Sequence, residues 1–308
     1  MAVRETKITI LGAGAWGTIL AKLAAANGHN VVSWSRSGAM SLEEAIEGAE
    51  IVLSAVSMKG VRSVATAIQS LPIYPQAIFV TATKGLEPST TLTPAQIWRS
   101  SFPTHPVVVL CGPNLSKEIE QNLPAATVVA SNDIGAAEIV QEAFSSLRFR
   151  VYTNFDPLGV ELGGILKNVM AIAAGACDGL QLGTNAKAAL LTRGLTEIVR
   201  IGNSWGAKTE TFYGLSGLGD LLATCNSPLS RNYQVGYSLA QGKTLEATLA
   251  SLEGTAEGVN TAKVLMQRAR QYSISIPITT QVHRLLTGKV TPRQALEELM
   301  LRDIKPEI

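Results

Sequence analysis

The sequence has little charge, few aromatic residues and only three cysteines, and these scarcities exclude several classes of protein. Charged residues make up 16% of the 308 residues and hydrophobic residues 46%, a balance that excludes intrinsic disorder as the main state. The 26 Lys and Arg residues against 24 Asp and Glu leave a net charge of +2, which argues against a chain built to coat nucleic acid or an acidic membrane. The length fits one large domain or two ordinary ones.

Cysteine, histidine and long apolar runs are scarce as well. Cys111, Cys177 and Cys225 form no CxxC pair, and the three histidines show no metal-ligand spacing, so we expect no metal site. The N-terminus lacks the apolar core of a signal peptide, and the most apolar stretch, residues 163–179, is interrupted by a lysine and an asparagine and is too short to span a bilayer. We therefore expect a cytoplasmic protein without a membrane span.

The first half of the chain alternates β-rich runs with helical patterns. Short apolar runs separated by helices are typical of a parallel sheet that is covered on both faces. We therefore predict an α/β fold whose N-terminal domain, residues 1–155, is a doubly wound, Rossmann-like parallel sheet that binds a dinucleotide. The expected strands are Lys7–Leu11, Val31–Ser35, Ile51–Val56, Ala77–Ala82, Val107–Cys111, Ala126–Ala130 and Phe149–Tyr152.

The second half lacks such strands, and glycine and proline separate its helical patterns. We predict an all-helical C-terminal domain over residues 156–308, which would bind the substrate. The expected helices are Gly159–Ala176, Ala186–Gly202, a stretch near Leu221, Asn232–Gln241, Leu245–Leu252, Thr261–Tyr272, Ile278–Thr287 and Pro292–Leu299.

A glycine motif follows the first expected strand. Gly12, Gly14 and Gly17 match GxGxxG and stand between a strand and a helix, which is the context that a dinucleotide-binding turn requires. The first glycine permits the tight turn, the second lets the backbone approach a pyrophosphate, and the third lets the helix pack on the sheet. The helix N-terminus then offers its N–H groups to the anion.

The end of the second expected strand indicates which dinucleotide binds. NAD-selective sites place an acidic residue there to hold the ribose hydroxyls. This chain has Ser35, Arg36 and Ser37 instead, with no acid before Glu43. Because a guanidinium can bind the 2′-phosphate that a carboxylate would repel, the sequence favours NADP over NAD. The alternative is that Arg36 is an ordinary surface charge.

Polar residues and glycines follow the next expected strands. Ligands of open parallel sheets bind beyond the carboxyl ends of the strands. Lys84 follows the fourth strand, and Gly112 and Asn114 follow the fifth. We therefore expect Lys84 to reach the crevice, and a solvated lysine in a turn is the alternative.

A lysine on an apolar helix is the most informative feature of the second half. Between Leu162 and Cys177 the only polar side chains are those of Lys167 and Asn168. An ammonium there is costly unless it is paired, and burial together with a second cation such as Lys84 would lower its pKa toward the working pH. Lys167 is therefore a candidate general acid or base. The alternative is a lysine that extends from a packed helix into solvent.

Two loops of the second half end in polar residues. Asp220 follows a glycine-rich loop, and capping of the next helix is the simpler interpretation of this acid. Ser230, Arg231 and Asn232 combine a hydroxyl, a guanidinium and an amide at a helix N-terminus. That composition suits an anion such as a phosphate monoester.

Taken together, these segments resemble the bacterial-type NAD(P)-dependent sn-glycerol-3-phosphate dehydrogenases. The matching segments span nearly the whole chain in order, and the stretch from Gly159 to Asn232 is far more specific than GxGxxG. They are GAGAWGTILA from Gly12, TKGLE from Thr83, GPN from Gly112, GVELGGILKNVMAIAAGACDGL from Gly159, NAKAALLTRGLTE from Asn185, GLSGLGDLLATC from Gly214, SRN from Ser230 and EGVNTAKVL from Glu257.

The resemblance implies a role for each matching residue. Lys167 would be the catalytic proton acceptor and also a substrate ligand, and Lys84 would contact both cofactor and substrate. The other substrate ligands would be Gly112, Asn114, Asn168, Asp220, Ser230, Arg231 and Asn232. The other cofactor contacts would come from Gly12, Gly14, Ala15, Trp16, Gly17, Arg36, Ser116, Arg231 and Glu257.

The activity that the resemblance implies interconverts dihydroxyacetone phosphate and sn-glycerol 3-phosphate with NADP, or with NAD, and supplies glycerol 3-phosphate for phospholipid synthesis. A related hydroxy-acid dehydrogenase stays open as an alternative. Such an enzyme would need a pair of residues that binds the substrate carboxylate in place of the SRN motif. A non-catalytic NADPH-binding sensor stays open too, and it would not need Lys167 or Asp220. We expect a phosphorylated small molecule as partner and no nucleic acid, and the sequence leaves a monomer and a homodimer open.

The chain departs from the family pattern at three places. Residues 37–50 are fewer than the family usually has between the second and third strands, which affects the wall beside the adenosine. Ser57 and Met58 replace the usual Pro-Ser, and Asn114 stands where a hydroxyl is common. None of these departures affects Lys167, Asp220 or the SRN motif.

Overall fold

The computed structural model describes residues 5–304 and 306, and contacts divide them into two compact units. The first unit comprises the residues up to Ile165 together with Gly206–Asp220, and the second comprises Leu166–Trp205 and the residues from Leu221 onward. The chain therefore passes between the units three times. The domain boundary predicted after residue 155 follows the end of the last strand at Asn154 and stays a prediction.

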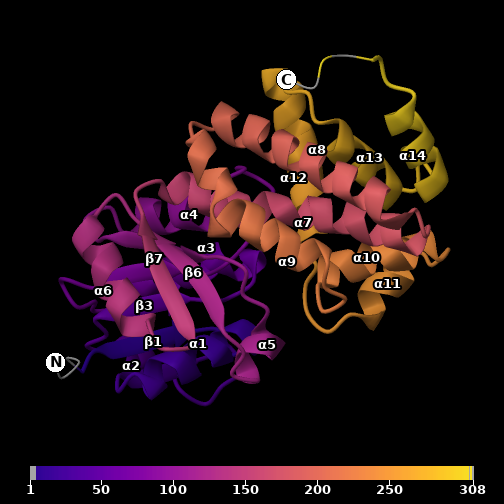
Figure 1. Cartoon of the computed structure of the whole chain (residues 1–308). Helices are drawn as coiled ribbons and strands as arrows, with labels where there is room; N and C mark the ends of the chain where they lie inside the picture. The colour runs from indigo at the N-terminus through magenta and orange to yellow at the C-terminus, as the bar shows by residue number, and fades with distance from the viewer. Residues whose placement is uncertain (1–4, 305, 307–308) are drawn as a thin grey trace. The chain divides into compact units, whose positions relative to one another are not determined.

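The first unit contains a seven-stranded sheet in the spatial order β2-β1-β3-β4-β5-β6-β7. Figure 1 labels β1, β3, β6 and β7 of this sheet. Each of the seven predicted strands is present, because each is a β-rich apolar run of a length that suits a strand. The strands are β1 (Lys7–Leu11), β2 (Asn30–Trp34), β3 (Ile51–Ser54), β4 (Ile78–Thr81), β5 (Val107–Cys111), β6 (Ala125–Ala130) and β7 (Phe149–Asn154).

One pairing differs from the predicted all-parallel sheet. β6 runs antiparallel to β5, whereas β1–β2, β1–β3, β3–β4, β4–β5 and β6–β7 are parallel pairs. The connection from β5 to β6 contains only the five-residue helix α5 (Ser116–Glu120), which is shorter than the helices that usually bridge parallel strands. A short apolar run gives no information on strand direction, so the sequence pattern did not indicate this reversal.

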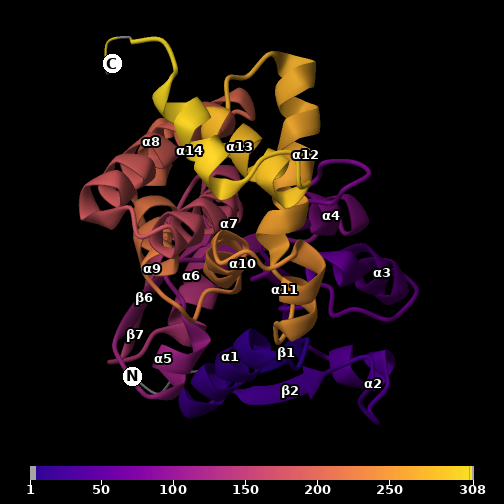
Figure 2. The same cartoon turned by 90° about the vertical axis from the view of Figure 1, so that its right-hand side faces the viewer.

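Helices cover both faces of the sheet, as the doubly wound prediction requires. Side chains of α1 (Ala15–Ala26), α5 and α6 (Ile134–Phe144) form one core with the strand residues Ile10 and Val80. Side chains of α2 (Leu42–Ile46), α3 (Met58–Gln69) and α4 (Pro94–Ser101) form the other core with Leu11 and Phe79. Successive residues of a strand point to opposite faces, so Ile10 and Leu11 lie in different cores. Figure 2 labels α1 and α3, one helix from each face.

The described residues of the second unit form α-helices joined by turns and loops, without a strand, which matches the predicted helices. The first unit contributes two short non-α helices, η1 (Thr209–Tyr213), a 3-10 helix, and η2 (Leu215–Gly219), a π-helix. The α-helices from residue 157 onward are α7 (Pro157–Gly179), α8 (Gly183–Ser204), α9 (Asp220–Cys225), α10 (Arg231–Ala240), α11 (Leu245–Ser251), α12 (Glu257–Tyr272), α13 (Pro277–Leu286) and α14 (Pro292–Met300).

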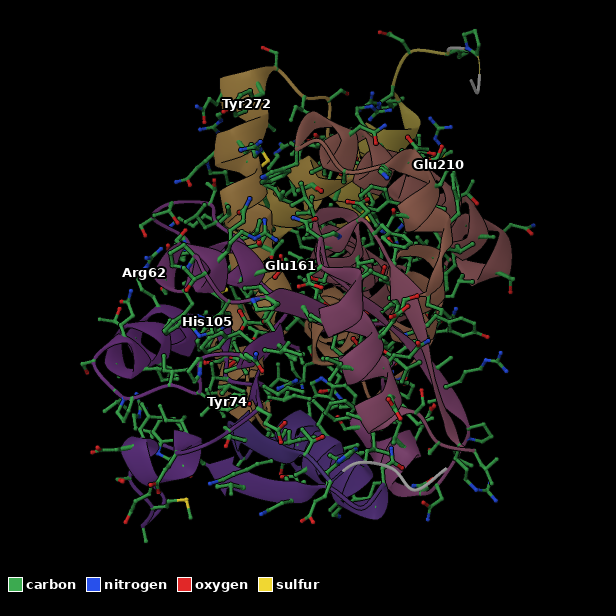
Figure 3. All side chains as sticks on the ribbon, turned by 90° about the vertical axis from the view of Figure 1, so that its left-hand side faces the viewer. Arg62, Tyr74, His105, Glu161, Glu210 and Tyr272 are labelled. Carbon is green, nitrogen blue, oxygen red and sulfur yellow. The ribbon has the colours of Figure 1, made fainter. Side chains whose placement is uncertain are left out.

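Helix α7 begins in the first unit and continues into the second after Ile165. Among the described residues it is the one helix long and apolar enough to cross a membrane, because it begins six residues before the apolar stretch 163–179, and 94% of its most apolar window is buried in the protein. That degree of burial is typical of a core helix. In its first-unit part, Glu161 (Figure 3) accepts a hydrogen bond from the backbone N–H of Ala95 at 2.8 Å, at the N-terminus of α4.

Candidate active site

The glycine motif forms the turn between β1 and α1. Gly12 has a φ of +115°, and a Cβ there would lie 2.9 Å from the carbonyl carbon of Ala55. A Cβ on Gly17 would lie 1.9 Å from the carbonyl oxygen of Gly12. At Gly14, the exposed N-cap of α1, no atom lies within 4 Å of the Cβ position. The turn therefore has the close backbone packing and the open helix N-terminus that a pyrophosphate requires.

Other cofactor candidates of the first unit follow the same strand ends. Arg36 is exposed in a turn just after β2, which the N–H of Gly38 closes by donating to the carbonyl of Ser35 at 2.9 Å. The parallel register sets the last residue of β2 beside the last residue of β1, so Arg36 and the glycine turn follow paired strand ends. Ala15 is exposed on α1, Trp16 is half-buried against the core, and Ser116 is the first residue of α5.

Two acceptors hold the ammonium of Lys84. Its Nζ donates to Oδ2 of Asp220 at 2.6 Å and to the carbonyl of Gly112 at 3.1 Å, and all three residues belong to the first unit. Burial alone would lower the pKa of Lys84, but the carboxylate of Asp220, aided by Cys111, raises it above its ordinary value. Lys84 is therefore a fixed cation at neutral pH and not a solvated lysine in a turn.

Asp220 does not act as the simple helix cap that the sequence suggested. Its side chain is 3% exposed and receives the ammonium of Lys84 at the junction of η2 and α9. The glycine loop before it packs backbone against backbone, because a Cβ on Gly217 would lie 2.1 Å from the carbonyl oxygen of Phe212. This packing positions a carboxylate from late in the chain beside a lysine that follows β4.

The surroundings of Lys84 include a residue that the sequence analysis did not single out. A Cβ on Gly164 of α7 would lie 2.2 Å from Sγ of Cys111 and 3.4 Å from Cε of Lys84. Cys111 is the last residue of β5, so its position at a strand end was the available signal.

Asn114, one of the predicted substrate ligands, is tied to the neighbouring strand. Its Oδ1 accepts from the hydroxyl of Thr127 at 3.0 Å, and its Nδ2 donates to the carbonyl of Ala126 at 3.4 Å. The asparagine thus connects the loop after β5 to β6, and a substrate contact of this side chain stays a prediction.

In the second unit, Lys167 is buried on α7 and does not extend into solvent. The residue is 6% exposed, and its Nζ donates to the hydroxyl of Thr224 at 2.5 Å. The sequence analysis missed Thr224. Its signal was the spacing of four residues from Asp220, which sets the two side chains on one face of α9.

A chain of amide contacts joins three helices of the second unit. Nδ2 of Asn232 donates to Oδ1 of Asn168 at 3.0 Å, and the N–H of Gly258 donates to Oδ1 of Asn232 at 2.9 Å. Both asparagines are buried. Asn168 on α7, Asn232 on α10 and Gly258 on α12 are therefore held in one fixed arrangement.

The three residues of the SRN motif differ in exposure: Ser230 and Asn232 are buried, and Arg231 is exposed. The hydroxyl of Ser230 caps α10 by accepting from the N–H of Tyr233 at 3.3 Å, and Asn232 is buried as described. Arg231, the first residue of α10, is exposed. Glu257, a predicted cofactor contact, is half-buried as the first residue of α12.

The structure thus collects the predicted residues into two groups, one in each unit. Lys84, Gly112 and Asp220 meet in the first unit, while Lys167 meets Thr224 in the second. The described residues contain no group of three or more His, Cys, Asp or Glu side chains that could hold a metal ion.

Family models match both halves of the chain. A model described as NAD-dependent glycerol-3-phosphate dehydrogenase N-terminus matches residues 7–41 and 37–137, and one described as the C-terminus of the same enzyme matches residues 156–297. The chain belongs to the NAD-dependent glycerol-3-phosphate dehydrogenase family. This membership confirms the resemblance found in the sequence.

Individual members of the family are closely similar. A glycerol-3-phosphate dehydrogenase (NAD(P)+) of Nostoc is 74% identical over 305 residues, which cover 99% of either chain. One from a Synechococcus strain is 62% identical over 301 residues, covering 98% of this chain and 97% of that protein. The crystal structure of the Coxiella burnetii glycerol-3-phosphate dehydrogenase, 35% identical, superposes with a TM-score of 0.92 over 97% of this chain and 99% of that one. This protein therefore has the fold of the family.

Proposed function

We propose that this protein interconverts dihydroxyacetone phosphate and sn-glycerol 3-phosphate by hydride transfer with NADP or NAD. The observation that carries the proposal is the buried Lys167, hydrogen-bonded to Thr224, in a chain of this family. The names of the similar curated proteins state the same activity and both cofactors.

The residues of the first unit fit a dinucleotide. The tight packing at Gly12 and Gly17 and the open space at Gly14 suit a pyrophosphate at the N-terminus of α1, and the exposed Arg36 suits a 2′-phosphate. When bound, the reduced nicotinamide supplies a hydride to C2 of the ketone. Further contacts would come from Ala15, Trp16, Lys84, Ser116, Arg231 and Glu257.

Lys167 holds the proton that the reaction needs. As an ammonium it donates this proton to the oxygen on C2 while negative charge develops there, and as a neutral amine it accepts the proton in the reverse direction. The hydroxyl of Thr224 can accept a hydrogen bond from the ammonium and can donate one to the neutral amine. The contact can therefore hold the lysine in place in both protonation states.

Lys84 and Asp220 supply fixed charge. The ammonium of Lys84, which Asp220 keeps protonated, would orient the substrate oxygens and stabilise negative charge. Arg231 and the N-terminus of α10 would hold the phosphate, so that C2 meets the cofactor in a fixed position. Gly112, Asn114, Asn168, Ser230 and Asn232 complete the proposed substrate site.

The two groups are close neighbours along the chain at two places. Asp220 is the last residue of its segment of the first unit, and Thr224 lies four residues later in the second. Gly164, which faces Lys84, and Lys167 lie three residues apart on α7.

The experiment that tests the proposal is a rate comparison with the purified protein. We expect NADPH, and more slowly NADH, to be oxidised with dihydroxyacetone phosphate, and Lys167→Ala to lower kcat by about 100-fold or more. Preference for an α-keto acid would instead identify a hydroxy-acid dehydrogenase. Tight NADPH binding without turnover of any ketone would identify a sensor, and either outcome contradicts the proposal.

We propose in addition that the enzyme works in the cytoplasm and supplies glycerol 3-phosphate for phospholipid synthesis. The three cysteines, all of them among the described residues, form no disulfide, which is consistent with a reducing compartment. A homodimer stays a proposal that light scattering of the purified protein decides.

A further inference from the structure

Gly254 is unusual among the glycines with left-handed backbone. Eight glycines of the described chain have positive φ, and at six of them no atom lies within 4 Å of the Cβ position. The two exceptions are Gly12, in the cofactor turn, and Gly254, in the loop between α11 and α12. Most of these glycines therefore serve only the turn geometry, while Gly254 also makes room for a neighbour.

That neighbour is the guanidinium of Arg231. A Cβ on Gly254, whose φ is +92°, would lie 2.3 Å from Nη1 and 3.5 Å from Cζ of Arg231. Since real Cβ atoms do not approach other atoms so closely, a side chain at position 254 would displace the guanidinium or the loop. The guanidinium of Arg231, which we propose binds the phosphate, therefore occupies the space that a side chain at position 254 would fill.

The backbone of Arg231 cannot yield, because two neighbouring side chains anchor α10 to α7. Asn232 donates to Asn168 at 3.0 Å, and the hydroxyl of Tyr233 donates to Oδ2 of Asp178 at 2.6 Å. The same carboxylate oxygen accepts from Nζ of Lys187 at 2.6 Å, which ties α8 into this anchor.

The helices also touch backbone to backbone at this crossing. A Cβ on Gly236 of α10 would lie 1.8 Å from the carbonyl oxygen of Ile172, and a Cβ on Gly175 of α7 would lie 2.0 Å from that of Tyr233. With the helix fixed in this way, the flexible end of Arg231 is the part that a new side chain at position 254 would move.

We propose that Gly254 is a positioning residue that sets where the guanidinium of Arg231 lies and thereby the preference for a phosphorylated substrate. The inference rests on the proposed function, because it takes Arg231 as the ligand of the phosphate. Gly254 itself has no side chain, and it would affect substrate binding only by setting the position of this arginine.

The first test is Gly254→Ala with Gly242→Ala as matched control. Gly242 has a φ of +83° and no atom within 4 Å of its Cβ position, so its variant carries the backbone strain without the contact. For Gly254→Ala we expect the KM for dihydroxyacetone phosphate to rise about 10- to 100-fold, the effect of a lost charge-assisted hydrogen bond, with kcat within a few-fold. At saturating NADPH, which removes any effect through the proposed cofactor contact of Arg231, the kcat/KM for unphosphorylated dihydroxyacetone should stay unchanged, and Gly242→Ala should change neither constant.

A second variant separates strain from displacement. Asn tolerates left-handed backbone better than Ala, so Gly254→Asn places a side chain at the position with less strain. We expect the same rise in KM from Gly254→Asn. An unchanged KM in a folded Gly254→Asn protein would overturn the inference.

A double-mutant cycle with Arg231→Ala completes the test. We expect Gly254→Ala to have no further effect on kcat/KM for dihydroxyacetone phosphate once the guanidinium is gone. An equal effect with and without Arg231 would overturn the inference about Gly254 alone. A normal kcat/KM in Arg231→Ala itself would instead contradict the proposed role of Arg231 and so the proposed function.

Discussion

One lysine of the candidate active site has a carboxylate as a hydrogen-bond partner, and the other has a hydroxyl. In the first unit, Lys84 donates to a carboxylate, which can only accept, and to a backbone carbonyl. In the second unit, Lys167 donates to the hydroxyl of Thr224, which can both accept and donate. The first environment requires a cation, whereas the hydroxyl can serve the ammonium and the neutral amine.

This difference suggests that the two lysines have different functions, one as a fixed positive charge and the other as a proton donor and acceptor. The carboxylate of Asp220 raises the pKa of Lys84 against the effect of burial, so we expect Lys84 to keep its proton throughout the proposed reaction. A proton donor, by contrast, must be able to lose its proton and regain it. We therefore predict that Lys84 supplies electrostatic stabilisation and that Lys167 transfers the proton.

The largest effect in the first unit is expected from Asp220→Asn. Removing one member of a buried ion pair leaves the other charge uncompensated, at a cost of about 3 kcal/mol. We expect kcat/KM to fall about 100-fold and the urea midpoint of unfolding to drop. Glu120→Gln, which breaks the exposed pair with Lys22 at 2.8 Å, is the control and should change neither. A fully active Asp220→Asn protein would remove the distinction between the two lysines.

A smaller effect is expected from Thr224→Val. The exchange removes the hydroxyl that holds Lys167 and keeps the side-chain shape. We expect kcat to fall about tenfold, as for one hydrogen bond to a charged group. Thr224→Ser should restore most of the rate, since it returns the hydroxyl. If Val and Ser variants behaved alike, the hydroxyl would have no part in holding the amine.

Glu161 extends the comparison to a buried acid on α7 and is expected to affect stability more than rate. Burial raises its pKa from an ordinary 4.5 to about 7, although Thr93, Ala95 and Arg99 act in the opposite direction. The folded protein therefore binds a proton that the unfolded chain has lost, and the free energy of unfolding should fall by about 3 kcal/mol as pH rises from 4.5 to above 7.

Urea unfolding of Glu161→Gln at pH 5 and pH 8 checks this expectation. The amide keeps an acceptor for the N–H of Ala95 and does not titrate, so the variant should lose much less stability over this range than the original protein. Identical pH dependence in the two proteins would show that Glu161 is ionised in the fold.

The local sequence pattern was enough to predict the strands and to single out Lys167. Seven apolar, β-rich runs gave seven strands, and in β3, β4 and β5 every residue is buried, which explains their unbroken apolar runs. Lys167 stood out because the helix around it is otherwise apolar, and the structure places it in the interior. In both cases the apolar or polar character of a few neighbouring residues was sufficient for the prediction.

Contacts between distant segments could not be predicted in the same way. Lys84 and Asp220 are 136 residues apart, and the residue pattern alone favoured a helix cap for the carboxylate; the family resemblance was needed to place both residues at the substrate site. The reversal of β6 and the tie between Asn114 and Thr127 also depend on how strands meet in space. Local propensities do not determine such pairings, because the same side chain can serve a cap, a strand contact or a ligand.

The most direct test of the division between charge and proton is to replace each lysine by arginine. Arginine keeps the positive charge but does not give up its proton near neutral pH. We expect Lys84→Arg to keep kcat within about tenfold and Lys167→Arg to lose about 100-fold or more, as Lys167→Ala does. A Lys167→Arg enzyme with near-normal turnover of dihydroxyacetone phosphate would contradict the account.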